Sequence, residues 1–312
     1  MSVNVFNTKE VQDLLKAASN IEGAGGNPRA QEIVHRLLSD LFKAIDDLDM
    51  TPDEIWAGIN YLNKLGTDGE SALLAAGLGL EKYIDIRLDA EDAAIGIQGG
   101  TPRTIEGPLY VAGAPVKEGA SRIDLDEDAD AAPLVIKGTV TGPDGQPVAG
   151  AIVEAWHANS KGFYSHFDPT TEHTPFNLRG AVRTGADGTY EFTTLMPTGY
   201  GCPPQGATQQ LLNVLNRHGN RPAHVHFFVA SDDFRKLTTQ FNIEGDPLTW
   251  DDFAYATREG LVPPVASKTG GKALGLKTDD YQEIVFDIRL TPLVQGKDNQ
   301  VVNRKRAEAQ AA

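Results

Sequence analysis

The most informative stretch of the sequence is Arg221-Pro222-Ala223-His224-Val225-His226-Phe227-Phe228-Val229. Its β-branched and aromatic residues predict a buried β-strand. Because His224 and His226 are two residues apart, their side chains point to the same face of that strand, with Cα atoms about 6–7 Å apart. Two imidazoles at this spacing can bind one metal ion, or they can be core histidines that hydrogen-bond to the backbone. The spacing alone favours neither interpretation.

The composition limits the class of protein. The chain has 312 residues, 40% of them hydrophobic, which suffices for one large domain or two ordinary ones. The formal net charge of −15 argues against nucleic acid and anionic membrane surfaces as partners. There is no apolar run of about 18 residues and no secretory signal pattern. A single cysteine, Cys202, excludes an internal disulfide, and we expect a cytoplasmic protein.

The N-terminal third has the periodicity of amphipathic helices. Asn7 with Glu10 predicts a capping box for a first helix, and Asn27-Pro28 and Thr51-Pro52 predict the starts of two more. A further helix is expected over residues 80–92. The wide apolar faces of these helices must be buried, either on the rest of the chain or on a second subunit. We favour a homodimer formed through the N-terminal helices.

After about residue 104 the pattern changes to short strands and turns. Residues 134–140 and 151–156 flank Gly142-Pro143-Asp144-Gly145, and this arrangement predicts a hairpin. Further strands are expected over residues 190–194, 224–230, 236–243 and 284–290. Many short strands without regularly spaced helices indicate an antiparallel β-sandwich. The expected fold is mainly β, with an α-helical dimerisation and linker domain over residues 1–104 and a β-sandwich domain over residues 105–312.

Two long irregular stretches, residues 157–180 and 196–221, lie between the expected strands. Loops of this length in a compact domain are usually functional. Each contains one tyrosine beside glycine, in Gly162-Phe163-Tyr164 and in Gly199-Tyr200-Gly201. Taken alone, such a tyrosine more often packs and hydrogen-bonds than binds a metal. Cys202, which follows the second motif, is expected to be a small buried residue.

The order of these segments resembles the intradiol ring-cleavage dioxygenases, and most closely the catechol 1,2-dioxygenases. The resemblance is carried by Ile152-Val153-Glu154-Ala155-Trp156-His157-Ala158-Asn159, by the two tyrosine motifs and by residues 221–226. It extends to the helical region, to residues 101–110 and to Asp252-Phe253-Ala254. It therefore covers most of the chain.

The resemblance implies a mononuclear non-haem Fe(III) centre, one iron per subunit, held by Tyr164, Tyr200, His224 and His226. Two phenolates and a solvent hydroxide neutralise the ferric charge, which makes its burial tolerable. The implied substrates are a small aromatic diol, catechol, and O2. The implied reaction is intradiol cleavage of catechol to cis,cis-muconate in the β-ketoadipate pathway of aromatic-compound degradation, with incorporation of both oxygen atoms.

The resemblance also implies which residues surround the iron. Tyr200 leaves the iron when the diol binds and accepts one of its protons. Arg221 stabilises developing negative charge, unless it forms an ordinary surface salt bridge, and Gln240 supports the site. The implied substrate pocket consists of Leu73, Ala76, Ile105, Gly107, Pro108, Leu109, Arg221, Phe253 and Ala254. Ala76 stands where many relatives carry proline, which leaves open a tolerance for substituted catechols.

Several alternatives stay open at this point. Chlorocatechol and hydroxyquinol 1,2-dioxygenases share the four ligands and differ in the pocket walls. A non-enzymatic, transthyretin-like β-sandwich binding module needs no metal. A zinc hydrolase that uses His224 and His226 lacks a third ligand at a suggestive spacing. The resemblance further raises a phospholipid as an occupant of the helical interface.

Overall fold

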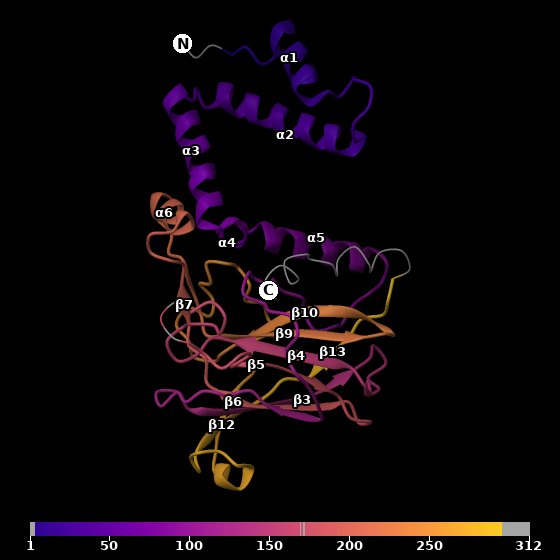
Figure 1. The fold of residues 1–312 in the computed structure, drawn as a ribbon. Coiled ribbons are helices and arrows are strands. Elements are labelled where there is room, and N and C mark those ends of the chain that lie inside the picture. The colour runs from indigo at the N-terminus through magenta and orange to yellow at the C-terminus, as the bar shows by residue number, and fades with distance from the viewer. Residues whose placement is uncertain (1–3, 169, 171, 295–312) are drawn as a thin grey trace. The chain divides into compact units, whose positions relative to one another are not determined.

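The computed structural model describes residues 4–168, 170 and 172–294 (Figure 1). The chain divides into two compact units, Met1–Thr67 and Asp68–Ala312. The first unit is helical, and the second contains both β-sheets. Within the described ranges, we find no helix whose length and apolar character would suit a membrane span.

The first unit contains α1 (Lys9–Ser19), α2 (Pro28–Asp47) and nearly all of α3 (Pro52–Asp68). The predicted start of α2 is confirmed, because the Asn27 side chain accepts the N–H of Ala30 and Pro28 is the first helical residue. The predicted start of α3 is also confirmed: Thr51 and Glu54 exchange hydrogen bonds between their side chains and backbone N–H groups.

The predicted start of α1 is wrong by one residue. The N-cap is Thr8, not Asn7, because Thr8 has the extended backbone (φ −71°, ψ 150°) that directs its hydroxyl to the N–H of Val11. The carboxylate of Asp46 accepts the N–H groups of Val5 and Phe6, so the chain ahead of α1 is tied to the end of α2.

The second unit contains α4 (Ser71–Gly77), α5 (Leu80–Ala94) and α6 (Ala207–Val214). The helix predicted over residues 80–92 is confirmed as α5. We did not predict α6, which lies within the stretch 196–221. Its N-cap, Gly206, has no side chain, and the carboxylates of Asp68 and Glu70 accept the N–H groups of Ala207 and Thr208 instead. Because the carboxylates that cap α6 are remote from it in sequence, no local pattern predicts this helix.

Two sheets form the β-sandwich of the second unit (Figure 1). The five-stranded sheet has the order β1 (Val116–Glu118), β5 (Arg179–Arg183), β4 (Ile152–His157), β9 (His224–Ser231) and β10 (Phe234–Asn242). The six-stranded sheet has the order β11 (Val265–Lys268), β12 (Tyr281–Val285), β3 (Pro133–Thr141), β6 (Thr189–Leu195) and β2 (Ala120–Arg122), with β13 (Ile288–Arg289) beside β3. A short ribbon joins β7 (Tyr200–Gly201) to β8 (Asn220–Arg221), and a 3-10 helix covers Gly271–Leu274.

The predicted sandwich is confirmed, although its sheets are mixed. The pairs β4–β5, β4–β9, β9–β10 and β3–β6 are antiparallel. The pairs β1–β5, β2–β6 and β3–β12 are parallel. Antiparallel pairing therefore holds in the strands that carry the histidines.

The predicted hairpin of residues 134–140 with 151–156 is wrong. β3 pairs with β6 and β12, whereas β4 lies in the other sheet between β5 and β9. The turn itself forms, since the N–H of Val148 donates to the carbonyl of Val140. At Gly150, which has φ +74°, the chain instead bonds to Thr184 beside β5 and so crosses to the second layer.

Side-chain alternation along β9 separates the core from the candidate site. Val225, Phe227 and Val229 belong to the apolar core between the sheets. The alternate residues His224 and His226 therefore point to the outer face of the five-stranded sheet. They are nevertheless buried, because Tyr110, Tyr164 and Tyr200 from the loops pack beside Trp156 and Phe228 on this face.

Candidate metal centre

The two histidines of β9 converge through the same ring atom. The Nε2 atoms of His224 and His226 are 3.1 Å apart. Nδ1 of His224 donates to the carbonyl oxygen of Pro222 at 2.6 Å, so the lone pair of this ring is on Nε2. Burial, reinforced by Arg221, lowers the pKa of His224 to about 3, and burial lowers the pKa of His226 well below its ordinary value. Both rings are therefore neutral at physiological pH, the form that binds metals.

The two loop tyrosines reach the same place. Tyr164 Oη lies 3.4 Å from His224 Nε2, and the ring centroids of Tyr164 and Tyr200 are 5.5 Å apart in an edge-to-face arrangement. Two glycines permit this approach. A Cβ on Gly162, which has φ +83°, would lie 2.9 Å from the Cβ of Tyr200, and a Cβ on Gly199 would lie 2.4 Å from the carbonyl oxygen of Arg221.

The two phenol oxygens and the two imidazole nitrogens together fit a hard, highly charged cation. Burial and the neighbouring Tyr200 raise the pKa of Tyr164 well above its ordinary value near 10, so a Lewis acid is required to ionise this phenol. The separation of the two Nε2 atoms suits two ligands of one metal ion at bond lengths of about 2.0–2.1 Å. Among the described residues, no group of three or more His, Cys, Asp or Glu side chains is placed to hold a metal. A zinc hydrolase site therefore has no support in this part of the chain.

Arg221 lies against the four candidate ligands Tyr164, Tyr200, His224 and His226, which we call the ligand cluster. Its Nη1 is 3.0 Å from His224 Nε2, and its Nη2 donates to Gln240 Oε1 at 2.9 Å. Its Nε and Nη2 donate to the two carboxylate oxygens of Asp252 at 3.2 and 3.1 Å. Burial alone would lower the pKa of Arg221, but the Asp252 carboxylate raises it. The interpretation as a surface salt bridge is wrong, because only 3% and 1% of the two side chains are exposed.

Cross-strand neighbours support this arrangement. Gln240 lies opposite His226 on β10, and its Nε2 donates to Asn242 Oδ1 at 3.2 Å. On the other side, Trp156 of β4 lies opposite His226, and its ring is stacked on the imidazole at 4.9 Å with planes 6° apart. Gln240 thus contacts Arg221, whereas the Trp156 ring packs flat against the imidazole of His226.

Sequence reasoning missed Asp252 and Trp156, although both stand in the segments that carry the family resemblance. A signal for Asp252 exists in principle, because a buried arginine needs an anionic partner. The burial of Arg221 cannot be read from the sequence, however. Trp156 becomes identifiable only when the register between β4 and β9 is known.

Most of the predicted pocket residues share one apolar cluster. Its members include Leu73, Ala76, Ile105, Phe253 and Ala254, together with Cys202 and Leu212. Leu109 packs instead with Trp156, Tyr164 and Tyr200, while Gly107 adjoins the ring of His226 and Pro108 is half-buried beside it. The predicted pocket residues thus fall into two groups, and in the second group Leu109 packs with the cluster of Tyr164 and Gly107 adjoins His226.

Two further residues, Arg217 and Cys202, lie among the predicted pocket residues. Arg217 donates to the carbonyl oxygens of Gly77 and Phe253 at 2.8 and 3.1 Å, and so holds the end of α4 against the Phe253 segment. Burial raises the pKa of the Cys202 thiol to about 12. The expectation that Cys202 is a small buried residue is thereby confirmed.

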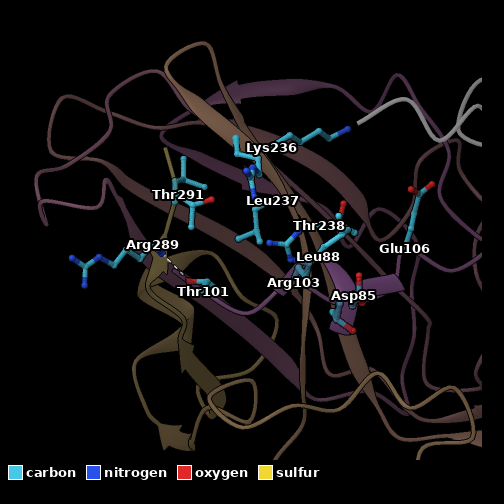
Figure 2. A pocket seen from close by; sticks show the side chains of 13 residues that line it. Asp85, Leu88, Thr101, Arg103, Glu106, Lys236, Leu237, Thr238, Arg289 and Thr291 are labelled. Carbon is cyan, nitrogen blue, oxygen red and sulfur yellow. Dashed lines mark hydrogen bonds between the residues drawn. The ribbon is translucent and has the colours of Figure 1, made fainter. Parts of the chain in front are cut away.

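A cavity lies between α5, residues 101–106 and β10 (Figure 2). Its lining residues include Asp85, Arg103, Glu106, Arg235 and Lys236, and none of the four candidate ligands is among them. The charged lining does not suit an apolar slot for an aromatic diol. Glu106 faces this cavity, whereas the next residue, Gly107, adjoins His226, so the chain at this point separates the cavity from the ligand cluster.

Comparisons with known proteins agree with this geometry. Residues 105–292 match the family described as Dioxygenase, and residues 27–96 match Catechol dioxygenase N terminus. The chain is 78% identical over 311 residues to catechol 1,2-dioxygenase 1 of Acinetobacter lwoffii, covering 100% of both chains. It is 32% identical to a chlorocatechol 1,2-dioxygenase of Cupriavidus pinatubonensis, covering 80% of this chain and 94% of the relative.

A solved structure gives the same result. The structure of catechol 1,2-dioxygenase from Acinetobacter sp. ADP1 matches with a TM-score of 0.93 at 57% identity, covering 97% of this chain and 98% of that one. Sequence and fold thus agree over both the helical region and the β-sandwich. The chain belongs to the intradiol ring-cleavage dioxygenase family.

Proposed function

We propose that the protein is a catechol 1,2-dioxygenase, which cleaves catechol with O2 between its two hydroxyl-bearing carbons and releases cis,cis-muconate. One observation carries the proposal: Tyr164, Tyr200, His224 and His226 converge beside a buried, charged Arg221. The 78% identity to a catechol 1,2-dioxygenase supports catechol as the substrate in preference to a chlorinated catechol.

The cofactor in this proposal is one Fe(III) per subunit. Its ligands are the phenolate oxygens of Tyr164 and Tyr200 and the Nε2 atoms of His224 and His226. When bound, ferric iron supplies a Lewis acid and electron acceptor that makes the coordinated diol reactive toward O2. Hard anionic phenolates favour the ferric over the ferrous ion.

The two tyrosines have different tasks in the proposal. Tyr164 is fully buried, and it would hold the iron both without and with substrate. Tyr200 is half-buried and pairs across the β7–β8 ribbon with Arg221. Its Oη would accept one proton of the incoming diol and the solvent hydroxide the other, so that the substrate would bind as the dianion.

Arg221 and the apolar walls act on the bound substrate. The guanidinium of Arg221 is permanently charged and lies against the ligand cluster, where negative charge on the substrate develops. Gln240 and Asp252 hold this guanidinium in place. The apolar cluster that contains Ile105 and Phe253 orients the flat ring and keeps bulk water away from it.

Turnover under ¹⁸O₂ tests the proposed activity. The iron-loaded protein should convert catechol to cis,cis-muconate with one labelled atom in each carboxylate, and it should form no semialdehyde from cleavage beside the diol. The kcat/KM for catechol should exceed the values for 4-chlorocatechol and hydroxyquinol. A preference for either of the latter would reassign the substrate, and no O2 uptake with any diol would contradict the activity.

A homodimer through the helices of residues 1–104 is part of the proposal. α2 has no buried residue, and apolar side chains are exposed on α2 and α3: Ile33, Val34, Leu37, Leu41, Trp56, Ile59 and Leu62. An apolar surface of this extent is typical of an interaction site. In our proposal a second copy of the chain, with a phospholipid in the interface, buries this surface. Such an enzyme of aromatic-compound degradation would reside in the cytoplasm.

Light scattering of the purified protein tests the homodimer. Leu37→Glu should halve the apparent mass, because it places a charge on the apolar face. The control Gln31→Glu adds the same charge at a polar, half-buried position of the same helix and should leave the mass unchanged. A wild-type monomer would contradict the homodimer. The absence of phospholipid from an organic extract of the protein would contradict the proposed phospholipid in the interface.

A further inference from the structure

Arg179 of β5 places a buried guanidinium beside Tyr164. Only 3% of the residue is exposed. Its Cζ lies 5.5 Å from the centroid of the Tyr164 ring and 5.7 Å from that of Phe167. Its Nε donates to Ser165 Oγ and its Nη2 to the Ser165 carbonyl, each at 3.0 Å. The side chain is thus fixed to the residue that follows Tyr164.

No carboxylate pairs with Arg179 in the part of the chain that the structure describes. Its hydrogen-bond partners are neutral, and its Nη1 has none. Burial lowers the pKa of Arg179 to about 10, and the acidic groups that act against this effect are the phenols of Tyr164 and Tyr110. A buried cation without a counter-charge is strongly unfavourable.

Only one of these phenols is free to supply the missing charge. The hydroxyl of Tyr110 donates to Glu154 Oε2 at 2.7 Å, and burial together with this carboxylate raises the pKa of Tyr110. Tyr110 therefore stays protonated. Among the residues that the structure describes, no carboxylate pairs with Tyr164, and its Oη lies 3.4 Å from His224 Nε2, where a metal ion can take the place of its proton.

The cations beside the two candidate tyrosine ligands differ in one respect. Arg221, which pairs with Tyr200 across the ribbon, is bound to the buried carboxylate of Asp252. Burial raises the pKa of Tyr164, and both guanidinium groups act against this effect, Arg221 more strongly than Arg179. Arg221 shares its charge with Asp252, whereas no carboxylate pairs with Arg179 among the described residues. Tyr164 is the acidic group that acts most strongly on Arg179.

We propose that Arg179 is a positioning residue of the iron centre: it is the counter-charge of the Tyr164 phenolate and supports Tyr164 as a ligand. This inference rests on the proposed function and extends it, because it assigns a role in iron binding to a residue that supplies no ligand.

Three variants separate the charge of Arg179 from its packing. Arg179→Met removes the charge and keeps an apolar stem. Arg179→Lys keeps the charge and loses the planar guanidinium that binds Ser165 through Nε and Nη2. Ser165→Ala is the matched control, since it removes the oxygen that Nε binds without changing any charge. Arg179→Gln, which is neutral but retains hydrogen-bond donors, repeats the test of charge with less disturbance of packing.

The readouts are the visible absorption of the iron-loaded proteins without substrate and the affinity for iron in competition with a chelator. Arg179→Met and Arg179→Gln should move the phenolate-to-iron band to longer wavelength, because a phenolate without its counter-charge is a better electron donor. Their iron affinity should fall about 10- to 100-fold, the usual effect of losing a residue that supports a ligand. Arg179→Lys and Ser165→Ala should keep the wild-type band.

Two results would overturn the inference. One is a wild-type band and wild-type iron affinity in both neutral variants. The other is an equal change in Ser165→Ala and the neutral variants, which would assign Arg179 a packing role only. A wild-type protein without any such band would instead contradict the proposed function itself, so the two failures are distinguishable.

Discussion

Replacement of His224 by alanine is expected to remove iron binding and ring cleavage together. The Nε2 of His224 is the atom on which the site converges, since it lies 3.1 Å from His226 Nε2 and 3.4 Å from Tyr164 Oη. Loss of a residue that merely supports a ligand typically costs 10- to 100-fold in metal affinity. Loss of the ligand itself should therefore cost more than about 100-fold. Iron content after reconstitution, measured by atomic emission, and the rate of catechol cleavage check this result.

A second histidine variant provides the control. The Nε2 of His218 lies 3.1 Å from the carboxylate of the exposed Asp251, and His218 is not one of the four candidate ligands. His218→Ala should retain one iron per subunit and the parent rate. Stoichiometric iron in His224→Ala, with an unchanged rate, would exclude His224 as a ligand and with it the proposed centre.

Replacement of Arg221 by leucine is expected to lower turnover about 10²- to 10³-fold while iron stays bound, which is the usual effect of removing one group that stabilises transition-state charge. The guanidinium touches the ligand cluster, but it supplies no metal ligand. The iron content of Arg221→Leu should therefore match the parent. An unchanged kcat would remove Arg221 from the mechanism.

Arg221→Leu also leaves the carboxylate of Asp252 buried without its partner, which should lower the free energy of unfolding by about 3–5 kcal/mol. The double variant Arg221→Leu/Asp252→Asn separates this loss of stability from the loss of catalysis. It should recover much of the stability and none of the turnover. Recovery of turnover in the double variant would mean that the stranded carboxylate, rather than the missing cation, caused the defect.

The sequence predicts the strand of the two histidines more reliably than the rest of the site. Alternation along residues 224–230 is a local property, and β9 has the expected faces. The tyrosines are different, because Tyr164 and Tyr200 reach the histidines only through loops whose approach depends on Gly162 and Gly199. No spacing rule connects these positions, so their role as ligands came from the family resemblance alone.

Errors in the predicted fold have a common physical origin in long-range contacts. The turn after β3 forms as its residues predict, but pairing with β5 and β9 draws β4 into the other sheet. Helix α6 begins at a glycine and is capped by Asp68 and Glu70 from another part of the chain. Where a cap is local, as at Asn27 or Thr51, the prediction is correct.

The residues around the ligands were the hardest to predict. Asp252, Trp156 and Arg179 matter here because of burial and partners that only the packed structure reveals. An arginine in a strand sequence is ordinarily a surface residue. Arg179 becomes informative only once its lack of a carboxylate partner, within the described residues, is set beside the phenol that it covers.

The most direct test of the proposed centre is the visible absorption spectrum of the aerobically purified, iron-loaded protein, before and after catechol is added without oxygen. We predict a broad tyrosinate-to-Fe(III) charge-transfer band, and hence a red protein, and we predict that the band shifts when the diol binds. A protein that binds no iron and stays colourless after reconstitution would contradict the four-ligand centre.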